Sequence, residues 1–339
     1  MTTPRFALSD AQWLAHRHVE GHDHLRFVHL PRAEHRRAPF LTDEYLGSNR
    51  PAHDVPVEQC LASLAPRRMG FLFHSAFCGS TLLLSALDRP GVAMGLSEPV
   101  ALNDVVGFRR RGAPGAAVAR LADAATRALA RPFGAGEMVV VKPSNVLNPM
   151  AELLLALRAD APAILLHAPL ETFLVSVVRK GLWCRLWVRE LLEGFLTDHA
   201  VDLGMAPGDY FRQSDLQVAA TGWLAQHALF HKLAAKLGPG RIATLDSETL
   251  TARPADVLAA AAAHYGLAAC AADVAAMAAS PAFTRHSKSG AAFDAATREA
   301  EYAAARTAHD DEIGKVATWA RAVAEANGIA ETLPLPLLG

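Results

Sequence analysis

The segment Arg68–Leu87 constrains this chain most, because a short apolar run passes directly into a loop of small and polar residues and then into an apolar helical pattern. The run Gly70-Phe71-Leu72-Phe73 predicts a buried strand, and Leu82-Leu83-Leu84 begins a helix. The loop between them, Ser75-Ala76-Phe77-Cys78-Gly79-Ser80-Thr81, brings backbone N–H groups and hydroxyls to the positive end of the helix dipole. This arrangement predicts an anion site, and phosphate is the ligand expected there.

The loop differs from those that bind ATP or GTP. Such loops carry Gly-Lys-Ser/Thr, whereas Cys78-Gly79-Ser80-Thr81 has no lysine. We therefore expect chemistry other than transfer of a terminal phosphate. The alternative is a plain helix start, in which Ser80 and Thr81 only cap the helix.

Further apolar runs without polar alternation predict strands at 137–142, 163–167 and 241–245, with a shorter one at 92–94. Unalternated strands are buried on both faces, as in a parallel sheet covered by helices. Helices are expected between and after them, and their ranges are about 116–130, 151–158, 171–195 (one helix or a pair), 218–237 and 254–264. Strands that alternate with helices predict an α/β fold, a three-layer parallel sheet flanked by helices.

The domain organisation follows from the same pattern. Residues 66–339 are predicted to form a single α/β domain with a helical C-terminal part. Residues 1–65 are polar, rich in His and Pro and weakly periodic, and they are predicted to be an arm that packs on this core. Short helices are expected in the arm around 10–18 and 58–64.

Composition excludes several classes of partner. The net charge of −1 argues against an extended nucleic-acid surface. No apolar run is long enough to cross a bilayer, and the first residues have no apolar signal-peptide core. Four widely spaced cysteines fit a reducing compartment, so we expect a cytoplasmic protein that contacts neither membrane nor nucleic acid. The oligomeric state is left open.

Ligands of open α/β sheets bind beyond the carboxyl ends of the strands. This rule places residues 74–81, Glu98, residues 142–145 and His167 along one rim of the predicted sheet.

Four pieces of the chain, in order and spacing, resemble the sulfotransferases that use 3'-phosphoadenosine-5'-phosphosulfate (PAPS). Residues 77–83 resemble the 5'-phosphate loop of that family, and residues 139–144 resemble its strand that ends in a basic residue. Residues 164–176 are similar to its 3'-phosphate segment, and residues 241–267 are similar to its last strand and the helices that follow. Together they extend across roughly residues 69–290.

The resemblance implies a P-loop-like sulfotransferase fold with added N- and C-terminal helices. It also implies an enzyme that moves a sulfuryl group from PAPS, as co-substrate, to a hydroxyl or amine of a small-molecule or glycan acceptor. Six loop residues would bind the donor, and they are Ala76, Phe77, Cys78, Gly79, Ser80 and Thr81.

The resemblance also assigns roles to residues outside the loop. Glu98, in Ser-Glu-Pro, is the expected general base, and Lys142 would place a positive charge on the reacting group. Ser176 would contact the 3'-phosphate, and Arg179, on the same helix face, or Lys180 could replace the arginine that the family has there. Arg285 and Lys288, in a late basic loop, would close over that phosphate.

The chain departs from the family pattern at three positions. Phe77 stands in place of a basic residue, Ser144 in place of a catalytic histidine and Ala168 in place of the 3'-phosphate arginine. These departures keep open a non-catalytic nucleotide-binding protein on the same scaffold. A second alternative is a P-loop-type small-molecule kinase of related topology, against which the missing lysine and the lack of an evident magnesium carboxylate after a buried strand count.

Histidine and tryptophan clusters receive simpler interpretations. His16, His18, His22 and His24 lie close together, and His227 and His231 are spaced by one helical turn, but neither set forms HExxH or adjoins a cysteine motif, so no metal is expected. Core packing is expected for four aromatic residues, with an apolar or sugar-binding pocket as the alternative, and they are Trp183, Trp187, Tyr210 and Phe211. The acceptor itself is not encoded in any recognisable motif.

Overall fold

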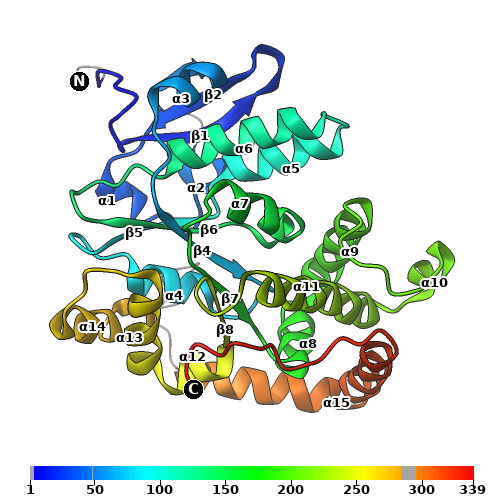
Figure 1. Cartoon of the computed structure of the whole chain (residues 1–339). Helices are drawn as coiled ribbons and strands as arrows, with labels where there is room; N and C mark the ends of the chain where they lie inside the picture. Colours follow the sequence, from blue (N-terminus) through cyan, green and yellow to red (C-terminus); the bar gives the residue numbers. More distant parts are fainter. Residues whose placement is uncertain (1–3, 48, 284–294) are drawn as a thin grey trace.

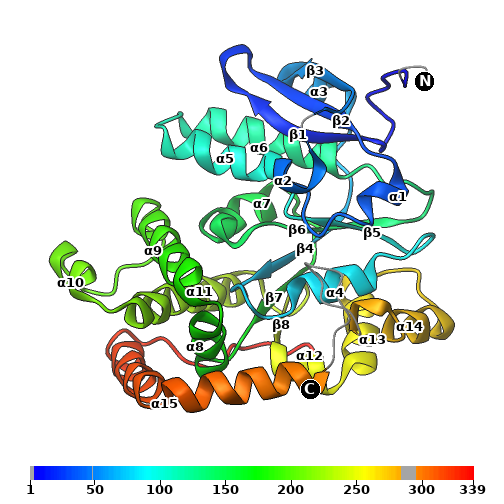
Figure 2. The ribbon, with the colours of Figure 1, turned by 180° about the vertical axis from the view of Figure 1, so that it is seen from behind.

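The computed structural model describes residues 4–47, 49–283 and 295–339. At its centre lies a five-stranded parallel sheet with the order β5-β6-β4-β7-β8. The strands are β4 (Met69–His74), β5 (Ala93–Ser97), β6 (Met138–Lys142), β7 (Ala163–His167) and β8 (Ile242–Asp246). Helices cover both faces of the sheet (Figures 1 and 2), so the α/β fold predicted from the unalternated runs is confirmed.

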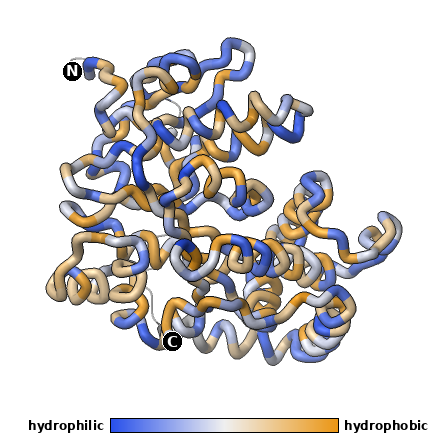
Figure 3. The backbone as a smooth tube through the Cα atoms, viewed as in Figure 1, coloured by the Kyte–Doolittle hydropathy of each residue, from blue (hydrophilic) through white to orange (hydrophobic). Residues whose placement is uncertain are grey.

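Every residue of β4 is buried, which explains why its sequence shows no alternation. Side chains still alternate in direction along the strand. Phe71 and Phe73 pack into one hydrophobic core and Leu72 into the other, on the opposite face of the sheet. Figure 3 shows apolar stretches running through the middle of the molecule, where the sheet lies.

The helices divide into two layers. One layer covers the face of Phe71, and its elements are α5 (Val100–Arg110), α6 (Gly115–Leu129), η2 (Asn145–Met150) and α7 (Ala151–Leu157). The other covers the face of Leu72, and its elements are α4 (Ser80–Leu87), α8 (Leu170–Arg179), α12 (Ser247–Ala252), α13 (Pro254–Tyr265), α14 (Ala271–Ala278), η3 (Pro281–Phe283) and α15 (Ala295–Ala326). The long α11 (Asp215–Leu237) contributes to both layers.

The helix pair expected at 171–195 is present as α8 and α9 (Gly181–Thr197), which meet at Gly181 with a φ of 69°. Figures 1 and 2 show α9 and the short α10 (Pro207–Arg212) projecting from the body of the molecule. Among the described residues, no helix combines the length and the apolar character that crossing a bilayer requires.

The N-terminal segment contains a three-stranded antiparallel sheet in the order β1-β2-β3. Its elements are β1 (Trp13–Val19), η1 (Glu20–His22), β2 (His24–His29), α1 (Arg32–His35), α2 (Asp43–Leu46), β3 (Ala52–Pro56) and α3 (Val57–Ser63). The helix expected around 58–64 is confirmed by α3. The helix expected around 10–18 is wrong, because β1 lies there.

The irregularity of β1 concealed it. Trp13 to His16 are four consecutive buried residues, and a break in register between Ala15 and Arg17 interrupts the alternation. Its partner β2 does alternate, with Leu25 and Phe27 buried on either side of the exposed Arg26. The division at residues 65 and 66 stays a prediction.

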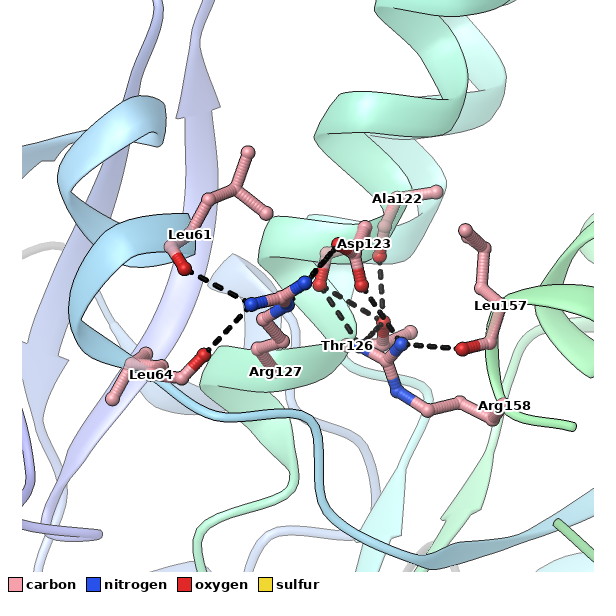
Figure 4. Close-up of polar contacts among 8 residues, drawn as sticks. All are labelled: Leu61, Leu64, Ala122, Asp123, Thr126, Arg127, Leu157 and Arg158. Atoms are coloured by element: carbon pink, nitrogen blue, oxygen red, sulfur yellow. Dashed lines mark hydrogen bonds and ion pairs between the residues drawn. The ribbon is translucent and has the colours of Figure 1, made fainter. Parts of the chain in front are cut away.

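A polar cluster ties the N-terminal segment to the first helical layer (Figure 4). Arg127 on α6 donates to the carbonyl oxygens of Leu61 (2.9 Å) and Leu64 (3.1 Å), at the end of α3, and pairs with Asp123 at 2.7 Å. Asp123 also accepts from Arg158, directly after α7, at 2.8 Å. Because Arg158 is only 3% exposed, its charge depends on these partners.

Strand β8 forms one edge of the central sheet, and residues 334–337 run beside it. The Thr244 N–H donates to the Leu335 carbonyl, and the Leu337 N–H donates to the Thr244 carbonyl, both at 2.8 Å.

Replacing Arg158 by alanine should lower the free energy of unfolding by about 2 kcal/mol, because its charged hydrogen bonds to the Asp123 carboxylate and the buried Thr126 hydroxyl would be lost, while Arg127 still pairs with Asp123. Urea unfolding of both proteins measures this change. Arg212→Ala is the control, since Arg212 is 78% exposed in its pair with Asp209 and should change the free energy by less than about 0.5 kcal/mol. Equal stability of the Arg158→Ala protein and the wild type would contradict the structural role.

Candidate functional site

The carboxyl ends of four strands meet at one edge of the sheet. Ser97 on β5 is in register with Lys142 on β6, and His74 on β4 is in register with Leu166 on β7. The segments that follow these strands therefore lie side by side, as the strand order predicts.

The loop after β4 has an unusual backbone. Ala76, Phe77 and Gly79 have positive φ values of 68°, 52° and 82°. This region costs about 1–2 kcal/mol for a residue other than glycine, and such conformations cluster at functional sites. Gly79 is the N-cap of α4 and carries no capping side chain, and the N–H groups of a first helical turn have no partner within the helix.

His74 at the end of β4 holds this loop. Its Nδ1 accepts the Ala76 N–H at 3.2 Å, and its Nε2 lies 3.1 Å from the Pro143 carbonyl oxygen. Because Nδ1 accepts, the ring proton is on Nε2, which donates to Pro143. Asn148 donates to the His74 carbonyl at 3.0 Å and to Gln226 on α11 at the same distance. His74 lay on the predicted rim, but sequence reasoning gave it no role.

The loop side chains are mostly turned into the protein. Cys78 is fully buried, and burial raises the pKa of its thiol to about 11, so it stays protonated at neutral pH. Ala76 and Ser80 are buried, whereas Phe77, Gly79 and Thr81 are half-buried. The backbone is therefore the main group that this loop can offer to a ligand.

Glu98 and Lys142, singled out separately in the sequence, form an ion pair in the structure. The Glu98 N–H also donates to the Lys142 carbonyl at 2.7 Å, and Glu98 has a φ of 48°. The Lys142 side chain is fully buried, whereas that of Glu98 is 21% exposed. A carboxylate that solvent can still reach thus lies against a buried ammonium.

Two neighbours complete this pair. His74 Nε2 lies 3.9 Å from a Glu98 carboxylate oxygen, which joins the pair to the loop. Phe40, between α1 and α2, places its ring centroid 5.0 Å from Lys142 Nζ. Sequence reasoning missed Phe40, since nothing near it in the chain marks a site.

Ser176 and Arg179 lie on α8 and are held by α15. The buried Ser176 Oγ donates to the Thr172 carbonyl at 3.0 Å and accepts from the Tyr302 hydroxyl at 2.6 Å. Arg179 pairs with Glu301 at 2.7 Å and lies over the Tyr302 ring, 4.7 Å from its centroid. Both predicted phosphate contacts thus have protein partners in this structure.

Arg285 and Lys288, the predicted phosphate clamp, lie outside the described residues.

The junction of α8 and α9 brings a cation to the loop. Lys180 Nζ lies 5.3 Å from the centroid of the Phe77 ring. The same ring contacts Phe173 on α8, with centroids 5.8 Å apart, and Trp187 on α9 at 5.4 Å. Phe77 thus makes apolar contacts with these two helices. The positive charge near the loop comes from Lys180 and not from residue 77 itself.

Core packing is wrong for two of the four aromatic residues. Trp187 and Tyr210 are half-buried and pack against the second core. Trp183 is 63% exposed and Phe211 is 89% exposed. Both lie on the projecting helices α9 and α10.

A buried histidine pair lies at the end of β7, where His167 is the last residue of the strand and His227 belongs to α11. Burial lowers the pKa of His167 to about 4 and lowers that of His227 well below its ordinary value. Trp223 stacks on His227 at 3.5 Å and donates its indole N–H to the Ala168 carbonyl at 2.8 Å. Both rings are therefore neutral at pH 7 and serve packing in this state. Within residues 4–47, 49–283 and 295–339, no group of three or more His, Cys, Asp or Glu side chains is placed to hold a metal ion.

No protein family model matches the chain, and no curated protein matches it. Several solved structures are similar to it, and three of them are sulfotransferases. The sulfotransferase domain from the curacin biosynthetic pathway is 18% identical, with 60% of this chain and 75% of that chain covered and a TM-score of 0.39. Sulfotransferase STF1 from Mycobacterium tuberculosis H37Rv is 17% identical (65% and 73% covered, TM-score 0.42), and sulfotransferase STF9 from Mycobacterium avium is 11% identical (74% and 79% covered, TM-score 0.41).

The buried histidines predict a loss of stability in acid. Below pH 6.5 the unfolded chain binds a proton at His167 that the folded protein excludes until about pH 4. The free energy of unfolding should therefore decrease as the pH is lowered from 6.5 toward 4, by about 1.4 kcal/mol per pH unit from this residue alone. Urea unfolding between pH 7 and pH 4.5 measures the slope, and His167→Gln should flatten it by that amount. An unchanged slope in His167→Gln would show that His167 is already protonated when folded.

Proposed function

We propose that this protein is a sulfotransferase that moves a sulfuryl group from PAPS to a hydroxyl or amine of its acceptor. The ion pair of Glu98 and Lys142 carries the proposal, because it lies next to the loop between β4 and α4 at the carboxyl edge of the sheet. The order and spacing of the sequence motifs support the same activity. The acceptor would be a small molecule or a glycan, and the cytoplasmic location stays a prediction.

The donor would be held mainly by backbone. The N–H groups around Gly79 and the hydroxyls of Ser80 and Thr81 would bind its 5'-phosphate at the positive end of α4. Lys180 would supply the positive charge that the family places at the position of Phe77. Ala76 and Cys78 would shape the loop rather than touch the donor through their side chains.

The reaction would use the ion pair as a unit. Glu98 would accept the proton of the acceptor hydroxyl or amine while the acceptor atom bonds to sulfur. The bond between sulfur and the 5'-phosphate oxygen breaks, and 3',5'-ADP leaves with the electron pair. As Glu98 becomes neutral, the Lys142 ammonium would stabilise the negative charge that develops on the sulfuryl oxygens and the leaving phosphate.

The 3'-phosphate would be bound by Ser176, Arg179 and the clamp residues Arg285 and Lys288. Because Glu301 and Tyr302 hold the first two, the phosphate would have to replace a carboxylate and a phenol hydroxyl. Phosphate can accept from the same donors as Glu301 does, so the exchange conserves the partners of Arg179.

Because Tyr302 and Glu301 already bind Ser176 and Arg179, a second candidate function is a nucleotide-binding protein without transfer activity. A small-molecule kinase is the third, and it would need magnesium with ATP.

Thermal unfolding with 3',5'-ADP tests donor binding, beside 5'-AMP and ATP with magnesium. A ligand at 100 times its dissociation constant stabilises the folded state by about 2.7 kcal/mol, so 3',5'-ADP should raise Tm clearly and 5'-AMP much less. Gly79→Ala should reduce this shift, since Gly79 has a φ of 82° and an added Cβ would meet Leu250 at 3.2 Å. Gly240→Ala, with open space around it, is the control. A shift with ATP and magnesium alone would favour the kinase.

Glu98→Gln tests the transfer step. The amide cannot accept the proton, so kcat should fall about 100-fold or more, while stabilisation by 3',5'-ADP should persist. Transfer of a labelled sulfuryl group from PAPS to an acceptor found by screening measures kcat. Glu44→Gln, an exposed carboxylate of the N-terminal segment, is the matched control and should keep full activity. Equal rates in Glu98→Gln and wild type would remove Glu98 from the mechanism. Nucleotide stabilisation without transfer to any acceptor would favour the non-catalytic candidate.

A further inference from the structure

One face of α9 exposes large apolar side chains. Leu182, Trp183 and Leu186 are 70%, 63% and 54% exposed, and they lie within five consecutive residues of one helix. The helix projects from the body of the protein (Figures 1 and 2), yet it carries apolar stretches (Figure 3). Isolated exposed leucines are ordinary, but a contiguous apolar patch marks a binding surface.

The arginines of α9 are engaged in ion pairs to other helices. Arg185 lies 3.4 Å from Glu312 and 3.8 Å from Asp215, and Arg189 pairs with Asp215 at 2.7 Å. Apart from the indole N–H of Trp183, the patch therefore presents carbon, and it ends at the exposed Glu190, one turn beyond Leu186. A sugar needs several hydrogen-bond donors and acceptors, so this surface suits an apolar ligand better than a glycan.

A series of ring contacts joins the patch to the anion loop. Phe77 in the loop contacts Trp187 with centroids 5.4 Å apart. Trp187 is followed outward by Trp183, with centroids 6.3 Å apart and ring planes inclined by 12°. Apolar ring contacts thus run from the loop, where the reacting group would be held, to the exposed side chains in the first turns of α9.

The size of the patch argues for a small ligand. A stable protein interface buries roughly 800 Å² on each partner, whereas even a large aromatic side chain offers at most about 250 Å². Three partly exposed side chains therefore fall short of a dimer interface. An alkyl or ring system of small-molecule size can cover them.

We propose that Leu182, Trp183 and Leu186, with Trp187 and Phe77, bind the apolar body of the acceptor. The acceptor is then a hydrophobic alcohol or amine, with its reactive group directed toward Glu98. This inference rests on the proposed function and narrows its acceptor class.

Binding of a series of linear alcohols to the full chain tests the inference. With 3',5'-ADP saturating, affinities of 1-hexanol, 1-octanol and 1-decanol are measured by calorimetry or tryptophan fluorescence. Burial of each CH₂ group should tighten binding about fourfold. The double variant Trp183→Ser and Leu186→Ser should lose most of this gain, because the alkyl chain of the alcohol would no longer be buried against apolar side chains. Phe211→Ser is the matched control, an exposed aromatic residue on α10 that should bind as wild type does.

Stabilisation by 3',5'-ADP shows that each variant folds and binds the donor product. Normal stabilisation together with no saturable alcohol binding, or with equal gains in wild type and the double variant, overturns the acceptor surface alone. If the wild type sediments with phosphatidylcholine vesicles and the double variant does not, the patch binds a membrane instead of an acceptor. If the wild type forms a concentration-dependent dimer and the double variant does not, the patch binds a second copy of the chain. Either result overturns the acceptor surface. Failure of 3',5'-ADP to stabilise the wild type overturns the proposed function, and the acceptor role with it.

Discussion

The buried ammonium of Lys142 is the constraint on which the site depends. A charge in the protein interior is costly unless a partner of opposite sign and good geometry is present. Glu98 supplies this partner, and its left-handed backbone and its N–H bond to the Lys142 carbonyl hold it in place. The ends of β5 and β6 are thereby fixed together, and Phe40 from the N-terminal segment covers the pair. The N-terminal segment is thus part of the site wall.

Strain in the neighbouring loop is balanced in a similar way. Positive φ values at Ala76 and Phe77 are unfavourable by themselves, so they persist only where surrounding contacts fix them. His74 supplies one such contact, and Asn148 and Gln226 hold His74 from the other side. These bonds connect segments 74 to 78 residues apart in sequence, so the loop shape depends on the folded core rather than on its own sequence.

Local pattern was enough to predict the central sheet and most of its helices, because strands buried on both faces must be apolar throughout. It failed for β1, where an irregular register hides the alternation, and for the exposed Trp183, since hydrophobicity alone does not tell a core residue from a surface one. The contact between Glu98 and Lys142 followed only indirectly, from the rule that strand ends meet. Ser176 and Arg179 contact Tyr302 and Glu301 on α15, which lie more than 120 residues away in sequence. No pattern in either segment predicts these contacts.

The course of residues 334–337 has a consequence for assembly. A sheet edge with free N–H and C=O groups invites pairing with a strand of another molecule. Here Thr244 of β8 directs its backbone groups to Leu335 and Leu337 of the same chain. The sheet therefore cannot be extended at this position by a strand from a second molecule.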